Sequence, residues 1–205
     1  MFQFIEFTAV IVSAVFGILL ARRHGMDFVG VFSLACITAF GGGTLRDVLL
    51  DRHPLFWIQH HHYPVIVFVL SVLSIGVPNV PEKLERWLYF PDALGMGLFS
   101  IVGTTAALQQ ETSWFVASLF GVMTGTFGGV MGDVVCNQVP SLFRPAVPLY
   151  ATCAFVGCWV FLLLTASPLG DPYPTVIAIV VIIAIRMVAL RRKICLPSVM
   201  KKNED

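Results

Sequence analysis

The sequence predicts an all-α integral membrane protein with seven transmembrane helices, and two observations lead to this fold class. The first is composition: of the 205 residues, 57% are apolar and 12% are charged, and the mean hydropathy is +0.85. A soluble domain carries about 25% charged residues, and a chain of this size has too little interior to bury so much apolar surface. The composition therefore excludes an ordinary soluble enzyme and a disordered chain, and it indicates lipid as the surrounding solvent.

The second observation is the spacing of the apolar stretches. A helix needs about 20 apolar residues to cross a bilayer core of about 30 Å. Seven stretches are candidates, and they occupy most of the chain: residues 2–21, 28–50, 63–78, 91–110, 114–136, 147–166 and 174–190. The third is short, and Phe56, Trp57 and Ile58 would extend it at its start. The connections are too short for a soluble domain, so we expect residues 1–205 to form one transmembrane domain.

Basic residues in short loops mark the cytoplasmic side of a membrane protein. With seven spans, one side of the membrane receives ten basic residues, and the other side receives Arg52 alone. The ten are Arg22, Arg23, Lys83, Arg86, Arg144, Arg191, Arg192, Lys193, Lys201 and Lys202. This distribution predicts a multi-pass protein with its N-terminus outside and its C-terminus in the cytoplasm.

The chain contains an internal repeat with an offset of 86 residues. Without gaps, this offset aligns Glu6 with Asp92, Gly17 with Gly103, Thr38 with Thr124, Gly42 with Gly128, Gly43 with Gly129, Asp47 with Asp133 and Pro54 with Pro140. The expected units are residues 1–86 and 87–172, followed by a seventh helix and tail over 173–205. Because each unit holds three spans, the second enters the membrane from the opposite side, and such inverted repeats place their sites near the midplane.

Three consecutive glycines, Gly41, Gly42 and Gly43, lie inside the second span. Small residues in membrane helices commonly serve close packing. A triplet is denser than packing on one face requires, so we expect an unwound or kinked segment, with backbone carbonyls available to a permeating cation. Thr44 would then cap the second half-helix, with Asp47 as its partner, and the hydroxyls of Thr38 and Thr44 would add oxygen ligands.

Arg46 and Asp47 lie within the same span, and charges at membrane depth are functional candidates. Neighbouring helix residues point about 100° apart, so we favour an ion pair between Arg46 and Asp133 of the other repeat. The alternative is that these charges extend to the membrane interface. For Glu6 and Asp92, the helix macrodipole is the plain explanation. Arg186, in the seventh span, is expected to meet a carboxylate or the interface near the tail.

Other chemical signatures are weak. The five cysteines, Cys36, Cys136, Cys153, Cys158 and Cys195, form no CxxC pair, and His60, His61 and His62 are expected in a solvated loop. The sequence has no HExxH motif, no phosphate-binding GxxxxGK[ST] motif and no recognisable Ser/His/Asp set. We therefore expect neither an enzyme nor a resident metal or cofactor, and the net charge of +1 gives no reason to expect nucleic acid.

The segment GGGTLRDVLL at 41–50 and its second copy, GTFGGVMGDVV at 125–135, carry a family resemblance, together with the RMVALRRKICLP ending. Over nearly its whole length the chain resembles the bacterial trimeric intracellular cation (TRIC) channels, which also carry a glycine-transporter domain label. The resemblance implies a homotrimer in the bacterial inner membrane, in contact with membrane lipids. Each protomer would have its own potassium pore, lined by the kinked second and fifth spans. Phe127 and Gly132 depart from the family pattern, which has glycine and arginine at these positions.

The residues expected along the ion pathway are Thr38, Gly41, Gly42, Gly43, Thr44, Arg46, Asp47, Thr124, Gly128, Gly129 and Asp133. Potassium is the expected permeant ion, with sodium as a further candidate. Inverted repeats and broken helices serve carriers equally well, so a secondary transporter for a small amino acid such as glycine is the alternative. A trimeric membrane scaffold would leave the intramembrane charges unexplained.

Overall fold

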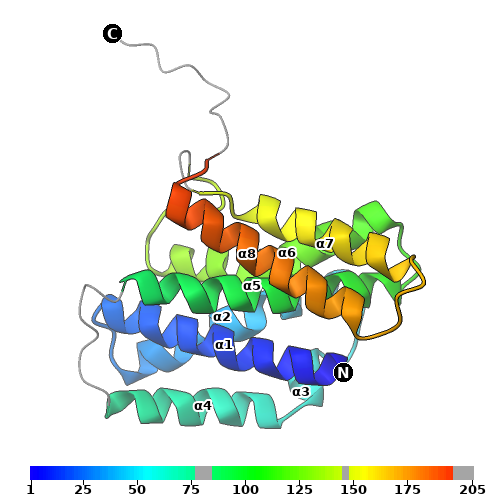
Figure 1. The fold of residues 1–205 in the computed structure, drawn as a ribbon. Coiled ribbons are helices and arrows are strands. Elements are labelled where there is room, and N and C mark those ends of the chain that lie inside the picture. Colours follow the sequence, from blue (N-terminus) through cyan, green and yellow to red (C-terminus); the bar gives the residue numbers. More distant parts are fainter. Residues whose placement is uncertain (77–84, 145–147, 196–205) are drawn as a thin grey trace.

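The computed structural model describes residues 1–76, 85–144 and 148–195, and these form one bundle of helices (Figure 1). Eight helices are assigned in these ranges: α1 (Phe2–Arg23), α2 (Phe28–Leu49), α3 (Phe56–Gln59), α4 (His62–Ile75), α5 (Glu85–Leu108), α6 (Trp114–Val135), α7 (Ala151–Thr165) and α8 (Tyr173–Arg192). Lys83, Lys201, Lys202 and the side chain of Arg86, all counted in the charge distribution, lie outside the described part.

Within the described residues, five helices are long and apolar enough to cross a membrane: α1, α2, α5 from Tyr89 onward, α6 and α8. They correspond to five of the predicted spans, and the prediction of an all-helical membrane protein is confirmed. The helices at the other two predicted spans are shorter, with 14 residues in α4 and 15 in α7. Phe56–Ile58 do not extend α4, because they belong to the separate helix α3, and the chain turns at His60 and His61 before α4 begins.

Local structure repeats along the chain with the same 86-residue offset as the sequence. α2 and α6 each contain 22 residues, and each begins after a side-chain cap, Asp27 accepting from Gly30 N and Ser113 from Val116 N. The offset also relates the residues with left-handed backbone on either side of these helices, Gly25 with Glu111 and Asp51 with Asn137. Equivalent turn and cap positions therefore begin and end equivalent helices.

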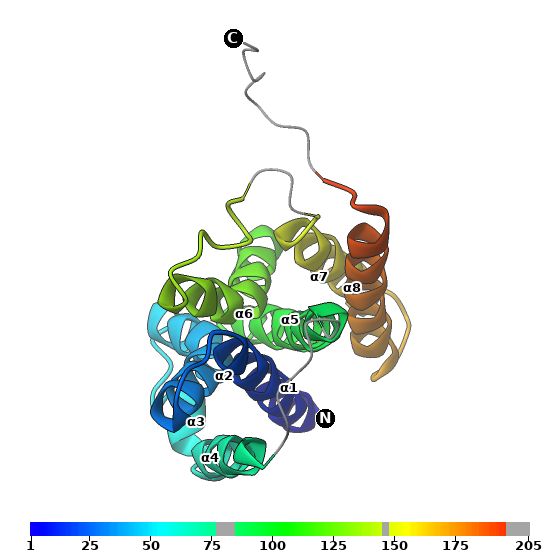
Figure 2. The same cartoon turned by 90° about the vertical axis from the view of Figure 1, so that its left-hand side faces the viewer.

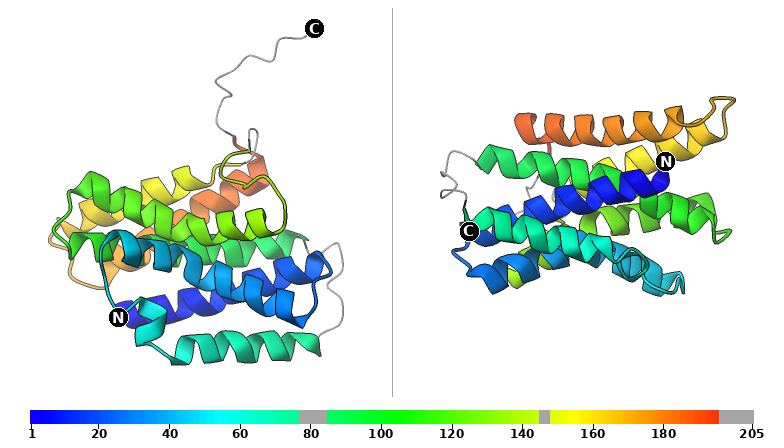
Figure 3. Two further views of the ribbon diagram at one scale, coloured as in Figure 1. Left: turned by 180° about the vertical axis from the view of Figure 1, so that it is seen from behind. Right: turned by 90° about the horizontal axis from the view of Figure 1, so that it is seen from below.

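The centre of the bundle is formed by α1, α2, α5 and α6 (Figure 2). α5 packs against α6, α1 and α8, while α4 covers α1 and α2 and α7 covers α6 and α8. α2 and α6 lie side by side and run in opposite directions (Figure 3). The start of α1 and the end of α8 lie at opposite ends of the bundle, whereas α1 and α8 both finish at the same end (Figure 1).

Candidate functional site

Glycines allow α2 and α6 to cross at backbone contact. A Cβ atom on Gly42 would collide with the carbonyl oxygen of Thr124, and a Cβ atom on Gly128 would collide with the carbonyl oxygen of Thr38. The two contacts are reciprocal: each glycine meets the residue that lies four positions before the other glycine. This pattern is expected of two antiparallel helices related by a local two-fold axis through their crossing point.

Both helices are continuous through their glycines, so an unwound segment, the first of the two predicted forms, is wrong, whereas a kink stays a prediction. Close packing explains the glycines, because an added Cβ atom at each of these positions would lie too close to a neighbouring group. A Cβ on Gly43 would overlap the Phe56 ring, one on Gly41 would lie 2.6 Å from Met131 Sδ, and one on Gly129 would lie 2.7 Å from Tyr150 Oη. A triplet is needed because the partners lie on different faces of α2.

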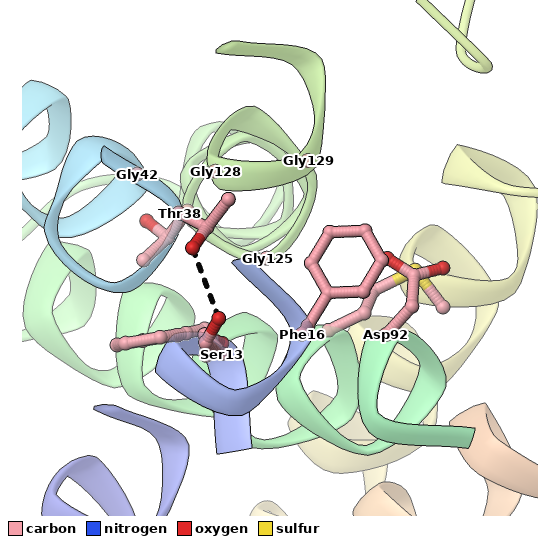
Figure 4. A pocket seen from close by; sticks show the side chains of 11 residues that line it. Ser13, Phe16, Thr38, Gly42, Asp92, Gly125, Gly128 and Gly129 are labelled. Carbon is pink, nitrogen blue, oxygen red and sulfur yellow. Dashed lines mark hydrogen bonds between the residues drawn. The ribbon is translucent and has the colours of Figure 1, made fainter. Parts of the chain in front are cut away.

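A narrow pocket lies beside this crossing, between α1, α2, α5 and α6 (Figure 4). Its lining residues are Ser13, Phe16, Thr38, Gly42, Asp92, Met96, Phe99, Thr124, Gly125, Gly128 and Gly129. Five of these belong to the predicted pathway, and they come from both α2 and α6. Gly41, Gly43, Thr44, Arg46, Asp47 and Asp133 are outside the lining set. Asp92 is the one charged residue of the lining.

The threonine hydroxyls of the pocket are tied to helix backbones. Thr38 Oγ1 donates toward the carbonyl oxygens of Ser13 and Leu34, each at 2.9 Å, and Figure 4 shows the bond to Ser13. Thr124 Oγ1 donates to Phe120 O at 2.7 Å. These bonds use the hydroxyl protons, so the oxygen lone pairs are the groups that remain for another ligand.

Thr44 lies in the interior of α2, where it cannot act as the predicted helix cap. Its hydroxyl oxygen accepts a hydrogen bond of 3.0 Å from Trp57 Nε1, which joins α2 to α3. Asp47 is not its capping partner either. The cap was expected because a break was expected, and both expectations fail together.

Arg46 is the centre of a buried ion cluster, which we call the Arg46 cluster and which consists of Glu6, Arg46, Asp47 and Phe56. Arg46 Nε donates to Asp47 Oδ1 at 2.8 Å, and its terminal nitrogens lie 3.3 Å from Glu6 Oε1. The guanidinium carbon is 5.2 Å from the centre of the Phe56 ring, and Asp47 Oδ2 accepts from Phe56 N at 2.8 Å. The cluster therefore joins α1, α2 and α3.

The predicted ion pair between Arg46 and Asp133 is wrong. Arg46 Nε lies 2.8 Å from Asp47 Oδ1, so the arginine side chain is long enough to reach its neighbour across the 100° between adjacent helix positions. Asp133 accepts a hydrogen bond from Ser141 N at 2.7 Å and lies 3.9 Å from the Arg144 guanidinium. It thus holds the chain after α6, as Asp47 holds the chain after α2.

A second cluster, the Arg186 cluster, consists of Asp92, Tyr150 and Arg186. Asp92 Oδ1 accepts from Tyr150 Oη at 3.0 Å, and Asp92 Oδ2 lies 3.5 Å from Arg186. Arg186 also donates to the carbonyl oxygens of Pro148 and Leu149, at 2.9 and 2.8 Å, and its guanidinium carbon lies 4.6 Å from the Tyr150 ring centre. From the sequence, Arg186 was expected to meet either a carboxylate or the interface near the tail, and the structure pairs it with the Asp92 carboxylate.

Glu6 and Asp92 lie beyond the first turns of α1 and α5, so the macrodipole does not account for them. Sequence reasoning missed the role of Tyr150, which comes from the segment before α7. It also missed the pocket-lining side chains Ser13, Phe16, Met96 and Phe99. Among the described residues, no group of three or more His, Cys, Asp or Glu side chains is arranged to hold a metal ion.

The fold and the pocket define a polytopic α-helical membrane protein with a narrow internal space between α1, α2, α5 and α6. The model of the family described as "Glycine transporter" matches residues 3–78 and 89–166. The chain is 34% identical over 197 residues to the UPF0126 inner membrane protein YadS of Escherichia coli, covering 91% of this chain and 90% of YadS. It is 38% identical over 147 residues to a UPF0126 membrane protein of Vibrio cholerae, covering 71% of this chain and 61% of that protein.

The structure is also similar to solved TRIC channels. A TRIC trimeric intracellular cation channel orthologue from Rhodobacter sphaeroides matches with a TM-score of 0.87 and 28% identity, over 94% of this chain and 98% of that one. A second TRIC cation channel structure matches with a TM-score of 0.86 and 26% identity, over 100% and 99% of the two chains. The chain belongs to the Glycine transporter family of membrane proteins, and its resemblance to the TRIC channels is confirmed.

Proposed function

We propose that this protein is a potassium-permeable channel whose ions pass the α2–α6 crossing through the pocket beside it. The observation that carries the proposal is the lining of this pocket, in a fold shared with TRIC cation channels. Thr38 and Thr124, each with a hydroxyl oxygen, line a narrow space together with Gly42, Gly128 and Gly129. Oxygen atoms at a constriction can replace part of the hydration shell of a monovalent cation. Sodium is a further candidate ion, and no cofactor is required.

The proposed architecture has seven membrane spans in two inverted units, residues 1–86 and 87–172, with α8 as the seventh span. The reciprocal glycine contacts at the antiparallel crossing support the inverted relation. The opposite positions of the start of α1 and the end of α8 support an odd number of crossings (Figure 1). With the basic ends of α1 and α8 on the cytoplasmic side, the N-terminus lies outside the bacterial inner membrane.

The proposed assembly is a homotrimer with one pore in each protomer. The Rhodobacter sphaeroides protein of the same fold is a trimeric channel. Large apolar side chains are exposed on several helices, among them Phe68, Val69 and Leu73 on α4 and Phe115 and Leu119 on α6. Such surfaces are suited to neighbouring protomers and to membrane lipids.

The path is not symmetric in its side chains. The 86-residue offset aligns Phe127 with Gly41 and Gly132 with Arg46 in the sequence. A Cβ on Gly132 would lie 3.1 Å from Thr38 Cγ2 and 3.3 Å from Leu20 Cδ2, so the missing side chain allows α6 to approach α1 and α2. Gly132 therefore carries no charge where the first half has Arg46, and it lets α6 pack closely against α1 and α2.

Purified protein in a planar lipid bilayer under a KCl gradient tests the proposal. We expect discrete potassium currents in the parent protein, and a clear loss of conductance in Thr38→Val and Thr124→Val, which keep the shape and remove the hydroxyl. Thr126→Val is the matched control, since Thr126 is buried on the same helix, bonds its own helix at Val122 O and does not line the pocket. Saturable glycine exchange without potassium current would support the carrier instead and would refute the channel.

A further inference from the structure

Asp92 occupies a special place in the pocket. It is the one charged side chain among the lining residues in the described part of the chain, and all other lining groups are neutral. Figure 4 shows it beside Phe16 and on the far side of the pocket from Thr38 (Figure 4). A carboxylate at the wall of a narrow, poorly hydrated space raises the local concentration of cations. Its net effect depends on whether a positive charge lies against it.

The positive charge against Asp92 comes from α8. Arg186 is 3% exposed, lies 3.5 Å from Asp92 Oδ2, and is held by the carbonyl oxygens of Pro148 and Leu149. In the first half of the chain, the equivalent carboxylate, Glu6, receives its guanidinium from α2 of the same half. The second half has Gly132 at the position equivalent to Arg46. α8 therefore supplies the arginine that α6 lacks.

The two arginines are not held equally. Arg46 Nε donates to Asp47, whereas Arg186 Nε is buried and has no hydrogen-bond acceptor among the described residues. Asp133, the counterpart of Asp47, is engaged with Ser141 N and lies near Arg144. A buried donor without an acceptor is unfavourable, because it has given up its hydrogen bond to water without replacing it. At Nε, Arg186 is therefore less completely satisfied than Arg46.

We propose that Asp92 imposes a cation preference on the pore only when its charge is exposed, and that Arg186 of α8 masks this charge in the parent protein, so that α8 controls charge selection at the pocket. This inference rests on the proposed channel function. With both charges present, the pair adds no net charge to the wall. Displacement of Arg186 exposes the carboxylate and favours cations, whereas loss of Asp92 leaves an uncompensated guanidinium that opposes them. α8, which lies outside the repeat, thus acts on the pocket that α1, α2, α5 and α6 line.

The reversal potential under a KCl gradient gives the K⁺/Cl⁻ permeability ratio and tests this charge arithmetic directly. Measurements belong at low ionic strength, where screening is weak. We expect Arg186→Gln to raise the ratio about tenfold, at the lower end of the ~10–10³ range for a focused charge. We expect Asp92→Asn to lower the ratio, and Asp92→Asn/Arg186→Gln to return it to the parent value, because the net charge is again zero.

Two further variants separate charge from structure. Arg186→Lys keeps the charge without the planar fork and should preserve the parent ratio. Arg191→Gln removes one positive charge from an exposed position on the same helix and should leave the ratio unchanged. If Arg186→Gln fails to fold, Asp92→Asn and the double variant still decide, since a ratio that stays constant between them overturns the proposal.

The outcomes also separate this inference from the proposed function. A parent protein that carries no potassium current refutes the channel before any variant is compared. A parent that conducts, with variants that change stability or current amplitude but leave the permeability ratio constant, refutes the charge mask alone. A ratio that follows the net charge of Asp92 and Arg186 supports both.

Discussion

The Arg46 cluster and the Arg186 cluster have the same local arrangement but are built from different parts of the chain. In each, a glycine of a crossing helix, Gly43 or Gly129, packs against an aromatic residue that lies below a guanidinium. In each, the guanidinium faces a carboxylate of the neighbouring helix. The first cluster takes its arginine from within the repeat, and the second takes it from α8.

The difference shows that two regions with the same local arrangement can keep an interaction while the residue that makes it comes from different parts of the chain. At the Arg46 cluster, Asp47 contacts both the arginine and the backbone of the aromatic residue. In the second half of the chain, Asp133 accepts from Ser141 N, outside the Arg186 cluster, and within the cluster the hydroxyl of Tyr150 bonds the Asp92 carboxylate directly. The Arg46 cluster is thus a closed ion network, whereas the Arg186 cluster is an ion pair beside the pocket.

Removal of the arginine should separate the two clusters most strongly. Arg46→Met leaves Glu6 and Asp47 buried without their cation, and breaking a buried pair in this way costs about 3–5 kcal/mol. Arg186→Met should cost less, because Asp92 keeps its bond to Tyr150 and is 12% exposed, against 2% for Asp47. Thermal unfolding midpoints in one detergent check the order. Equal midpoints for the two variants would contradict the distinction between a network and a pair.

The glycines of the crossing should be the next most sensitive positions. Gly42→Ala and Gly128→Ala each push a methyl group into a carbonyl oxygen of the opposite backbone, so we expect about 3 kcal/mol each, at the upper end of the ~1–3 kcal/mol cost of overpacking. The two losses should be similar, because the contacts are reciprocal. Gly170→Ala, where no heavy atom lies within 4 Å, is the control. An alanine that leaves the unfolding midpoint unchanged at either site would show that the two helices can move apart at the crossing at little cost.

Helix positions and apolar spans could be predicted from the sequence, because hydropathy and length are local properties. The role of the glycines could not, since unwinding and close packing both favour glycine and differ only in what lies across from Gly42. The partner of Arg46 was missed for a similar reason: Glu6 lies forty residues away in the chain, and no local pattern joins them.

The pocket was predicted in part. Thr38, Thr124 and three glycines could be found because they recur with the repeat. Asp92 also recurs with it, but its importance depends on Arg186 and Tyr150, which come from outside the aligned motif. An arginine within an apolar span was a usable signal, whereas a single tyrosine before a helix was not.

A tyrosine-to-phenylalanine exchange makes the Arg186 cluster resemble the Arg46 cluster. Tyr150→Phe removes the hydroxyl that donates to Asp92 and keeps the ring below the guanidinium. We expect a loss of about 1.5 kcal/mol, at the low end of the ~1.5–3 kcal/mol given for hydrogen bonds to charged groups. Unfolding midpoints of Tyr150→Phe and of Tyr63→Phe, a buried tyrosine on α4, provide the comparison. No change relative to the parent would mean that Arg186 alone holds Asp92.

The smallest effect is expected at the tail. Leu149 N donates to Ile194 O at 3.0 Å, and Leu149 O in turn accepts from Arg186, so the residues after α8 brace the loop that holds the arginine. A chain that ends at Lys193 loses this bond, the bond from Ile194 N to Ala189 O and the bridge between Pro148 and Cys195, and we expect a loss of about 1 kcal/mol, at the low end for such bonds. The same truncation should leave the Arg46 cluster untouched, because that cluster lies on α1, α2 and α3.

Combined variants test this separation. The stability losses of the truncation and of Arg46→Met should add, because distant sites are additive within about 0.5 kcal/mol. The losses of the truncation and of Arg186→Met should not add, because they share a partner. Full additivity with Arg186→Met would show that the tail does not act through this loop.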